Sequence, residues 1–232
     1  NGGPYVIENS LDFDGSDIFI ARLSPNGAAL LSSTYIGGSD QDGLNTNSLK
    51  YNYGDQFRGE ITLDANGNVY VTSTTYSTNF PTSSPGGTVQ SNISGIQDAV
   101  LFKMPPNLSS LIWSSYFGGL GIETGNSIQI SNSGNELCIA GGTNSNTLPV
   151  TTGEDLTFNG GISDGYAAKF NSNNGSLISG TFMGLNEYDQ TYFVQYDIND
   201  DIYVFGQTES SWPMSAGCYG IPNSGQFLRK YN

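Results

Sequence analysis

The sequence predicts an all-β protein built from repeated four-stranded units, and three observations lead to this class. Short runs of alternating apolar and polar residues follow one another through the 232 residues, without a helical period between them. Turns of Asn, Asp and Gly separate the runs, as in β-hairpins. The same succession returns after Asp17, Asp98 and Asp164. Long units with four strands each are typical of the blades of a β-propeller.

The order of strands within a blade follows from the glycine-rich break before each hairpin. We expect the hairpin to supply the innermost and second strands, and the strands after the next polar loop to be third and outer. This order gives two whole blades, 60–117 and 127–183, flanked by partial blades at 1–36 and 192–232. Closed propellers have about 4–8 blades, and one blade cannot bury both of its faces. We therefore expect residues 1–232 to be one segment of a larger propeller.

The first copy supplies the outer half of one blade and the inner half of the next. Its first two strands are expected at 18–23 and 30–36, joined by a Pro-Asn-Gly turn. The segment 39–58 has no counterpart in the other copies and is interpreted as a long insertion. A hairpin follows, with strands at 60–64 and 69–75 around an Asp-Ala-Asn-Gly-Asn turn.

The second and third copies repeat this plan without the insertion. Their strands are expected at 99–104, 110–117, 127–131, 136–142, 165–170, 177–183, 192–197 and 202–207. Polar loops follow the hairpins at 76–97, 143–163 and 208–225. In a four-stranded meander these loops leave at the same end as the insertion 39–58. We call this end the long-loop face, and we expect a partner to bind there because function concentrates on loops held by a rigid scaffold.

The charge balance excludes some partners. Seven Lys and Arg stand against 21 Asp and Glu, which gives a net charge of −14. Nucleic-acid binding needs clustered basic residues, and anionic membranes repel such a surface. The chain also lacks an apolar run of about 18 residues, so we expect no membrane insertion.

Catalytic motifs are absent from the sequence. Without a histidine, no Ser–His or Cys–His pair and no histidine metal site can form. Carboxylate pairs suited to a glycosidase remain conceivable, with Glu154–Asp155 and Glu187/Asp189 as candidates, although neighbouring acids on polar loops are usually solvated. The sequence predicts no catalytic residue, no metal site and no cofactor.

The sequence leaves two questions undecided, one about a disulfide and one about a bound cation. Cys138 falls where the sister copies have tyrosine, which indicates a core position, whereas Cys218 falls in a loop, so a disulfide between them is undecided. The Asn- and Asp-rich turns lack the ligands of a calcium loop and are explained by turn geometry. The stretch around Asp40 and Asp42 is a better cation candidate and is also undecided.

The aromatic residues divide into repeated and unrepeated ones. Tyr35 in the first copy has Tyr116 and Phe182 as counterparts, which predicts core positions for them. Tyr51 and Tyr53 belong to the insertion and Trp212 to a polar loop. Aromatic side chains on loops are common contact residues, so the sequence predicts Tyr51, Tyr53 and Trp212 as binding residues.

The first copy, DIFIARLSPNG, LLSSTYIGG and ITLDANGNVYVTSTTYSTNFP, resembles the bacterial SBBP β-propeller repeat. Ser73 stands where that repeat has Gly, and in the third copy Leu185 and Asp200-Asp201 replace Gly and Gly-Asn. The resemblance implies a secreted or cell-surface protein on the outer-membrane exterior. It also resembles repeats of Bacteroidota, which often accompany the type 9 secretion system, gliding motility or adhesion. The family carries no agreed catalytic residues.

Together these observations favour a non-catalytic binding or structural module of an exported surface protein. Its partner would be a protein or a glycan on the long-loop face, and the secretion machinery is a further expected partner. The alternatives are a polysaccharide-active hydrolase or lyase, which would need two converging buried acids, and a passive spacer domain.

Overall fold

A computed structural model describes residues 5–7, 15–45, 48–221 and 223–231. The described strands are β1 (Tyr5–Ile7), β2 (Ile18–Leu23), β3 (Leu30–Ile36), β4 (Glu60–Leu63), β5 (Val69–Thr75), β6 (Asp98–Met104), β7 (Trp113–Phe117), β8 (Glu123–Ile130), β9 (Glu136–Thr143), β10 (Asp164–Asn171), β11 (Leu177–Met183), β12 (Asp189–Tyr196), β13 (Ile202–Thr208) and β14 (Gln226–Tyr231), with a short 3₁₀ helix, η1 (Tyr53–Phe57). Nothing in this part of the chain is a helix long and apolar enough to cross a membrane.

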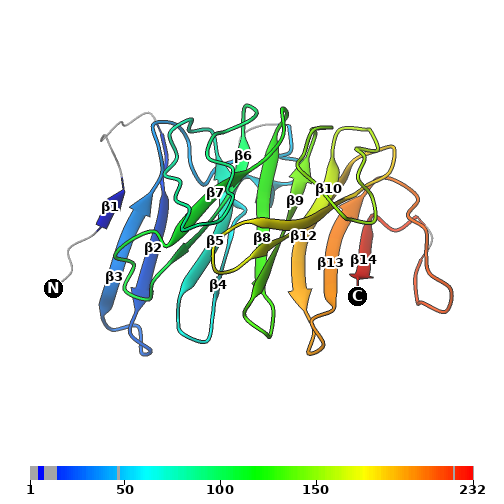
Figure 1. The fold of residues 1–232 in the computed structure, drawn as a ribbon. Coiled ribbons are helices and arrows are strands. Elements are labelled where there is room, and N and C mark those ends of the chain that lie inside the picture. Colours follow the sequence, from blue (N-terminus) through cyan, green and yellow to red (C-terminus); the bar gives the residue numbers. More distant parts are fainter. Residues whose placement is uncertain (1–4, 8–14, 46–47, 222, 232) are drawn as a thin grey trace.

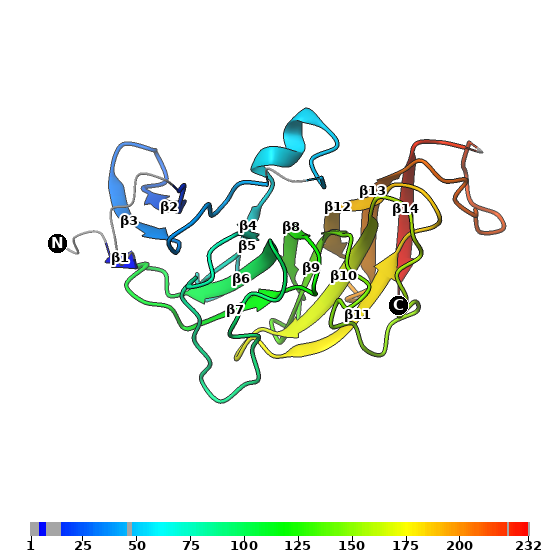
Figure 2. The same cartoon turned by 90° about the horizontal axis from the view of Figure 1, so that it is seen from above.

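The strands form four sheets that stand side by side around an arc (Figures 1 and 2). Two sheets have four antiparallel strands, in the orders β4-β5-β6-β7 and β8-β9-β10-β11. The flanking sheets have three strands, β1-β3-β2 at one end and β12-β13-β14 at the other. The chain is thus all-β with propeller blades of the predicted strand order, and the fold class is confirmed.

The innermost strands begin earlier than the sequence predicted. β8 starts at Glu123 rather than at 127, and β12 starts at Asp189 rather than at 192. A β-bulge interrupts each strand near its start, between Gly125 and Ser127 and between Thr191 and Phe193. The bulges break the period-2 alternation, so the pattern becomes regular only after them.

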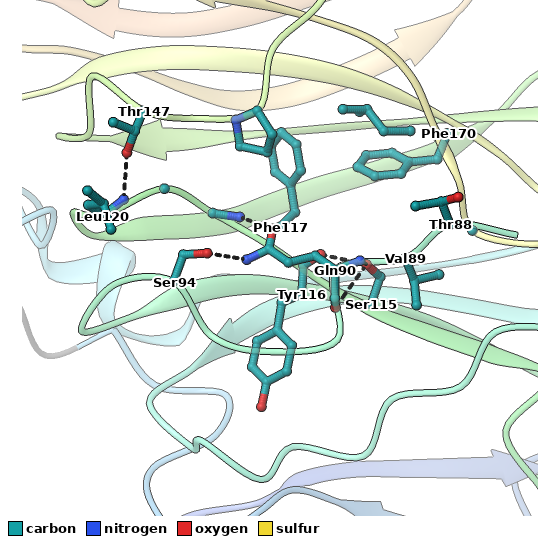
Figure 3. Close-up of a pocket in the computed structure, with 15 residues that line it drawn as sticks. Thr88, Val89, Gln90, Ser94, Ser115, Tyr116, Phe117, Leu120, Thr147 and Phe170 are labelled. Atoms are coloured by element: carbon teal, nitrogen blue, oxygen red, sulfur yellow. Dashed lines mark hydrogen bonds between the residues drawn. The ribbon is translucent and has the colours of Figure 1, made fainter.

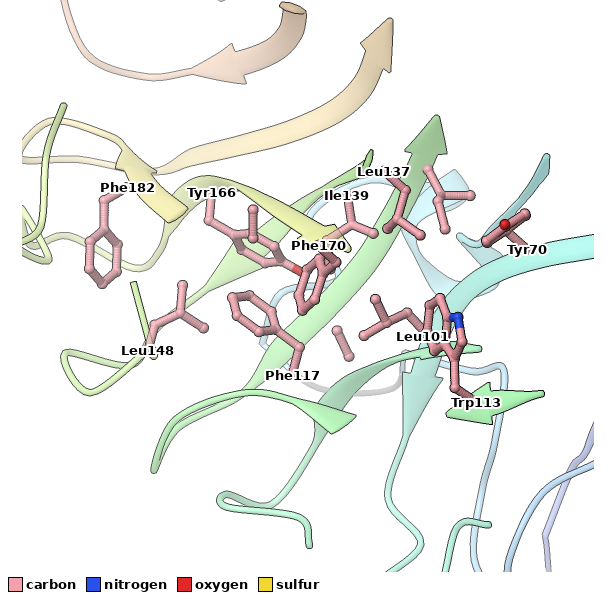
Figure 4. Close-up of a cluster of buried hydrophobic side chains, with 13 residues drawn as sticks. Tyr70, Leu101, Trp113, Phe117, Leu137, Ile139, Leu148, Tyr166, Phe170 and Phe182 are labelled. Atoms are coloured by element: carbon pink, nitrogen blue, oxygen red, sulfur yellow. The ribbon is translucent and has the colours of Figure 1, made fainter. Parts of the chain in front are cut away.

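The core lies between neighbouring blades, as expected for sheets that cannot bury two faces alone. The largest cluster fills the seam between the two whole blades (Figure 4). Trp113 of β7 is fully buried there, and its indole Nε1 donates to the Ser172 carbonyl oxygen of the next blade at 2.9 Å. Phe117 packs edge-on against Phe170, with 5.3 Å between the ring centroids.

One predicted core position is wrong. Tyr116 and Phe182 are buried, but Tyr35 of β3 is 44% exposed. Its sheet holds only the third and outer strands of a blade, with β1 added in parallel to β3. Fewer packed neighbours therefore surround Tyr35 than surround its counterparts in the whole blades.

Both cysteines are free thiols. Cys138 is fully buried in a core cluster with Val194 and Val204, as its repeat position predicted. Cys218 is exposed. Burial raises the pKa of the Cys138 thiol to about 12, so Cys138 behaves as a small apolar side chain.

The short turns and the long loops lie at opposite ends of the blades (Figure 1). In the turn between β4 and β5, Asp64 Oδ1 accepts the backbone N–H groups of Asn66 and Asn68, both at 2.9 Å. Gly67 takes the left-handed conformation with φ +77°. These contacts account for the Asp and Asn residues through turn geometry alone.

Candidate functional site on the long-loop face

The long loops do more than cap one end of the blades, because they also run along the outer strands. In the loop 76–97, Ser83 pairs with Ser114 and Gln90 pairs with Tyr116 of β7. The next loop, 143–163, pairs Thr152 with Gly180 of β11. An outer strand has unpaired N–H and C=O groups, and these pairings cover them.

A groove with a volume of about 530 Å³ lies between the loops 76–97 and 143–163, beside β7. Figure 3 shows Phe117, Leu120 and Phe170 among the lining side chains, and Phe170 comes from β10 of the next blade. Val89, Gln90 and Pro149 also line it. None of the described residues that line the groove is charged, so it offers apolar contact and hydrogen bonds rather than acid–base chemistry.

Gln90 holds the polar part of the groove in place. Its Nε2 donates to Ser94 Oγ at 3.0 Å and to Asp98 Oδ2 at 2.8 Å, and its Oε1 accepts the Gly118 N–H at 3.1 Å (Figure 3). At the edge, Leu120 is 74% exposed although its backbone N–H is fixed by Thr147 Oγ1 at 2.8 Å. The groove therefore presents apolar side chains on an ordered backbone.

The insertion begins later than predicted, because Asp42 already belongs to the innermost strand. Asp42 pairs with Thr75 of β5, and the next regular pair is Glu60 with Thr72. In the next blade the equivalent pairs enclose only 124–126, which contain the bulge. The insertion thus replaces a β-bulge, a position where the ladder is already interrupted.

The insertion reaches across to the last blade. Tyr51 stacks on Tyr188, with 4.0 Å between the ring centroids, and its hydroxyl donates to Glu209. Asn52 Nδ2 donates to Gln207 Oε1 at 2.6 Å. Figure 2 shows η1 on the concave side of the arc. These contacts tie together two blades that are distant in sequence.

A buried hydroxyl network lies beneath the insertion. The hydroxyls of Tyr188 and Tyr192 are 2.7 Å apart, and Tyr188 also donates to Gln190 Oε1 at 2.8 Å. Burial raises the pKa of Tyr192 to about 12 and that of Tyr188 further still, so both stay neutral. Arg58 lies over the Tyr192 ring, 4.8 Å from its centroid.

The three predicted contact residues have different surroundings. Tyr51 is exposed on one side and stacked on the other. The side chain of Tyr53 lies outside the described residues. Trp212 stacks on Phe227 of β14, with ring centroids 4.2 Å apart and 7° between the planes. Tyr51 and Trp212 therefore have roles within the fold, and their contact with a partner stays a prediction.

The acids singled out from the sequence lie in different surroundings. Glu154 binds Arg229 at 2.9 Å. Burial acts to raise the pKa of Asp155, but hydrogen bonds from Asn159 and Thr157 outweigh it and lower that pKa. Glu187 is exposed whereas Asp189 is fully buried. Asp42 is likewise buried rather than set in an open loop, with Oδ2 accepting Gly38 N–H at 2.7 Å.

The structure instead brings together acids that the sequence analysis did not pair. Asp98 at the start of β6 and Glu123 at the start of β8 are both fully buried. A Cβ added to Gly118 would lie 2.4 Å from Asp98 Oδ1 and 2.6 Å from Glu123 Oε2, so both oxygens pack against this glycine and lie close to each other. Asp17–Asp42 and Asp164–Asp189 occupy the equivalent positions in the other copies.

A sequence signal for these pairs existed. Each second acid follows the repeated glycine break by a few residues. It pairs with the threonine that ends the second strand in all three copies, through Asp42–Thr75, Glu123–Thr143 and Asp189–Thr208. The alignment of the three copies therefore contains both acids. The change from Asp to Glu and the insertion after Asp42 hide the second one.

The comparisons with known proteins bear on the repeat. No curated protein matches the chain in a sequence search. The profile of the family described as "SBBP: Beta-propeller repeat" matches residues 59–81, which contain the hairpin β4–β5 and the start of the following loop. This match supports the assignment of the repeat to the SBBP β-propeller repeat family.

Proposed function

We propose that this β-propeller segment is a non-catalytic binding module of an exported cell-surface protein. The observation that carries the proposal is the uncharged, mostly apolar groove between the loops 76–97 and 143–163. Apolar walls with a few fixed polar groups are typical of binding sites. Because its backbone is held by Gln90 and Thr147, little conformational entropy is lost when a partner binds.

The partner class is a protein segment or a glycan. Both offer flat or extended apolar surfaces that can lie against Leu120 and Pro149, with hydrogen-bonding groups at their edges. The net charge of −14 disfavours strongly acidic partners. Export through the type 9 secretion system and a role in adhesion or gliding belong to the same proposal and rest on the resemblance of the repeat.

The proposal is tested by retention of the protein on glycan arrays and on intact cells of the source organism. Leu120→Ala should weaken binding about fivefold or more, because it removes an apolar contact at the groove. Ile198→Ala is the matched control, since Ile198 is 88% exposed in the short turn between β12 and β13. Equal loss in both variants, or binding that neither variant affects, would contradict this placement.

The predicted aromatic contacts are tested in the same assay. Alanine at Tyr51, Tyr53 or Trp212 should weaken binding if the partner extends over the long-loop face. Because Tyr51 and Trp212 are stacked, their replacement should also cost about 0.5–1.5 kcal/mol of unfolding free energy. Tyr51→Phe keeps the ring that stacks on Tyr188, so a loss of binding in this variant is not due to loss of the stack.

The rival proposal of a polysaccharide-active enzyme has one specific observation in its favour, the converging acids Asp98 and Glu123. Both are fully buried and both accept hydrogen bonds from their own blades. Their equivalents recur in the other copies, which suits a structural role. Turnover of any glycan in the array, abolished by Glu123→Gln, would favour the enzyme.

A further inference from the structure

The converging acids lie at the seams between consecutive blades. Asp98 belongs to the third strand of one whole blade, and Glu123 begins the innermost strand of the next. Asp164 of β10 and Asp189 of β12 bridge the following seam in the same way. A feature that recurs at successive seams is part of how the blades are joined.

Each acid is oriented by donors from its own surroundings. Asp98 Oδ2 accepts the Ser94 N–H at 2.9 Å, and Glu123 accepts the Gly119 N–H at 3.0 Å and the Thr143 hydroxyl at 2.6 Å. In the second pair, Asp164 Oδ2 accepts the Asn159 N–H and Asp189 Oδ2 accepts the Leu185 N–H, both at 2.6 Å.

The remaining oxygens of the second pair have nothing to bind. Asp164 Oδ1 and Asp189 Oδ1 are buried without a hydrogen-bond partner, although the Thr208 hydroxyl lies near Asp189. Buried polar atoms are normally satisfied, and burial beside a like charge disfavours the ionised form of a carboxyl group. A proton held between the two acids would satisfy both oxygens at once.

The groups that face the pairs add no positive charge. Tyr116 and Tyr166 lie near Asp98 and Glu123, and Asp155 and Glu187 lie near the second pair. None of the ion pairs formed by the described residues involves any of these four acids. A proton shared between the two acids would supply the missing counter-charge.

We propose that Asp98–Glu123 and Asp164–Asp189 each share one proton as carboxylic acid–carboxylate clasps, so that the attachment of one blade to the next depends on pH. The pair Asp17–Asp42 has the equivalent position at the first seam. This inference goes beyond the proposed function and is independent of what the long-loop face binds.

The direction of the pH dependence follows from the folded and unfolded states. Burial raises the pKa of Glu123 to about 8 and that of Asp164 to about 7, against about 4 in an unfolded chain. Folding therefore takes up protons. The stability that these groups contribute is complete below pH of about 4 and is lost as the pH rises through about 7 to 8.

The experiment is urea unfolding of the whole 232-residue chain from pH 5 to pH 9. The midpoint should fall as the pH rises. Asp164→Asn should raise the midpoint at pH 8.5 and reduce its pH dependence, because the amide can donate to Asp189 Oδ1 while its oxygen still accepts the Asn159 N–H. Asp98→Asn should likewise raise the midpoint at pH 8.5 and reduce its pH dependence, through the pair Asp98–Glu123. Asp40→Asn is the matched control, since Asp40 is exposed.

A second measurement uses only the unaltered protein, so it does not depend on whether the variants fold. Side-chain carboxyl ¹³C resonances of the unaltered protein should include groups that titrate between pH 6 and 8, and these should vanish on unfolding. The clasp is overturned if every carboxyl titrates below pH 5, or if the midpoint is flat or rises up to pH 9. It is also overturned if calcium at pH 8.5 restores the midpoint measured at pH 5, since a cation would then hold the acids.

Discussion

At the residue scale, Trp113 joins two blades with its ring and with its N–H group. The Ser172 carbonyl that accepts this N–H also lies 3.3 Å from Lys103 Nζ and 3.4 Å from the Tyr70 hydroxyl. The Ser172 carbonyl oxygen, just after β10, thus accepts from three side chains of the preceding blade. The side chains that converge there come from β5, β6 and β7.

Replacement of Trp113 by Ala should lower the unfolding free energy by about 3–5 kcal/mol, because a fully buried ring leaves a cavity. Trp113→Phe should cost less, since part of the ring is kept and Ser172 O retains two other donors. Urea unfolding at one pH measures both. Leu120→Ala at an exposed position should change the unfolding free energy by under about 0.5 kcal/mol. A similar loss in all three variants would contradict this role for the seam.

At the scale of elements, the insertion shows how a blade accommodates extra chain. It leaves the innermost strand after Gly43 and returns at Glu60, at the place where β8 and β12 carry bulges. The strand pairs before and after it, Asp42–Thr75 and Glu60–Thr72, are kept. Its far end then packs on Tyr188 and Gln207, so it also acts as a brace between blades.

Replacement of residues 44–59 by the dipeptide Gly-Asn, the counterpart in β8, should leave the fold intact. The loss of the Tyr51 stack and of the Asn52 hydrogen bond should cost about 1–3 kcal/mol. Amide hydrogen exchange should become faster at Tyr188 and Tyr192, which the insertion covers, while β4 and β5 keep their protection. Loss of protection in β5 would show instead that the insertion is needed to form the strand pair.

The elements were largely predictable from sequence because alternation and turn chemistry are local. The hairpin at 60–75 needed only its Asp-Ala-Asn-Gly-Asn turn and its flanking apolar residues. The paths of the loops 76–97 and 143–163 along β7 and β11 were not predictable, because their few backbone pairs leave no periodic pattern. The carboxyl pairs were missed for a similar reason: each joins residues whose proximity depends on how two blades stack.

At the scale of the whole molecule, apolar side chains are exposed where the sheet β1-β3-β2 faces the first whole blade. Phe19 on β2 is 55% exposed, and Ile61 and Leu63 on β4 are 53% and 57% exposed. A gap of about 460 Å³ separates these strands. The sheet β1-β3-β2 holds only the third and outer positions of a blade, so the second and innermost positions beside β2 are unoccupied among the described residues.

The chain alone should therefore associate at micromolar concentration through these surfaces. Sedimentation velocity should show species that grow with concentration, and Phe19→Ser together with Leu63→Ser should reduce them. A chain extended by further repeats should be monomeric and melt in one cooperative transition. A monomeric 232-residue chain with cooperative melting would contradict the expectation that it is a segment of a larger propeller.

The position of the insertion has a practical consequence for protein engineering. In the first whole blade the insertion stands where the other blades have a bulge, and the strand pairs on either side of it are kept. The bulge between Gly125 and Ser127 occupies the equivalent position on β8, the innermost strand of the second whole blade. A peptide grafted there would emerge on the concave side of the arc from a rigid base, which makes this blade a scaffold for displaying loops of chosen sequence.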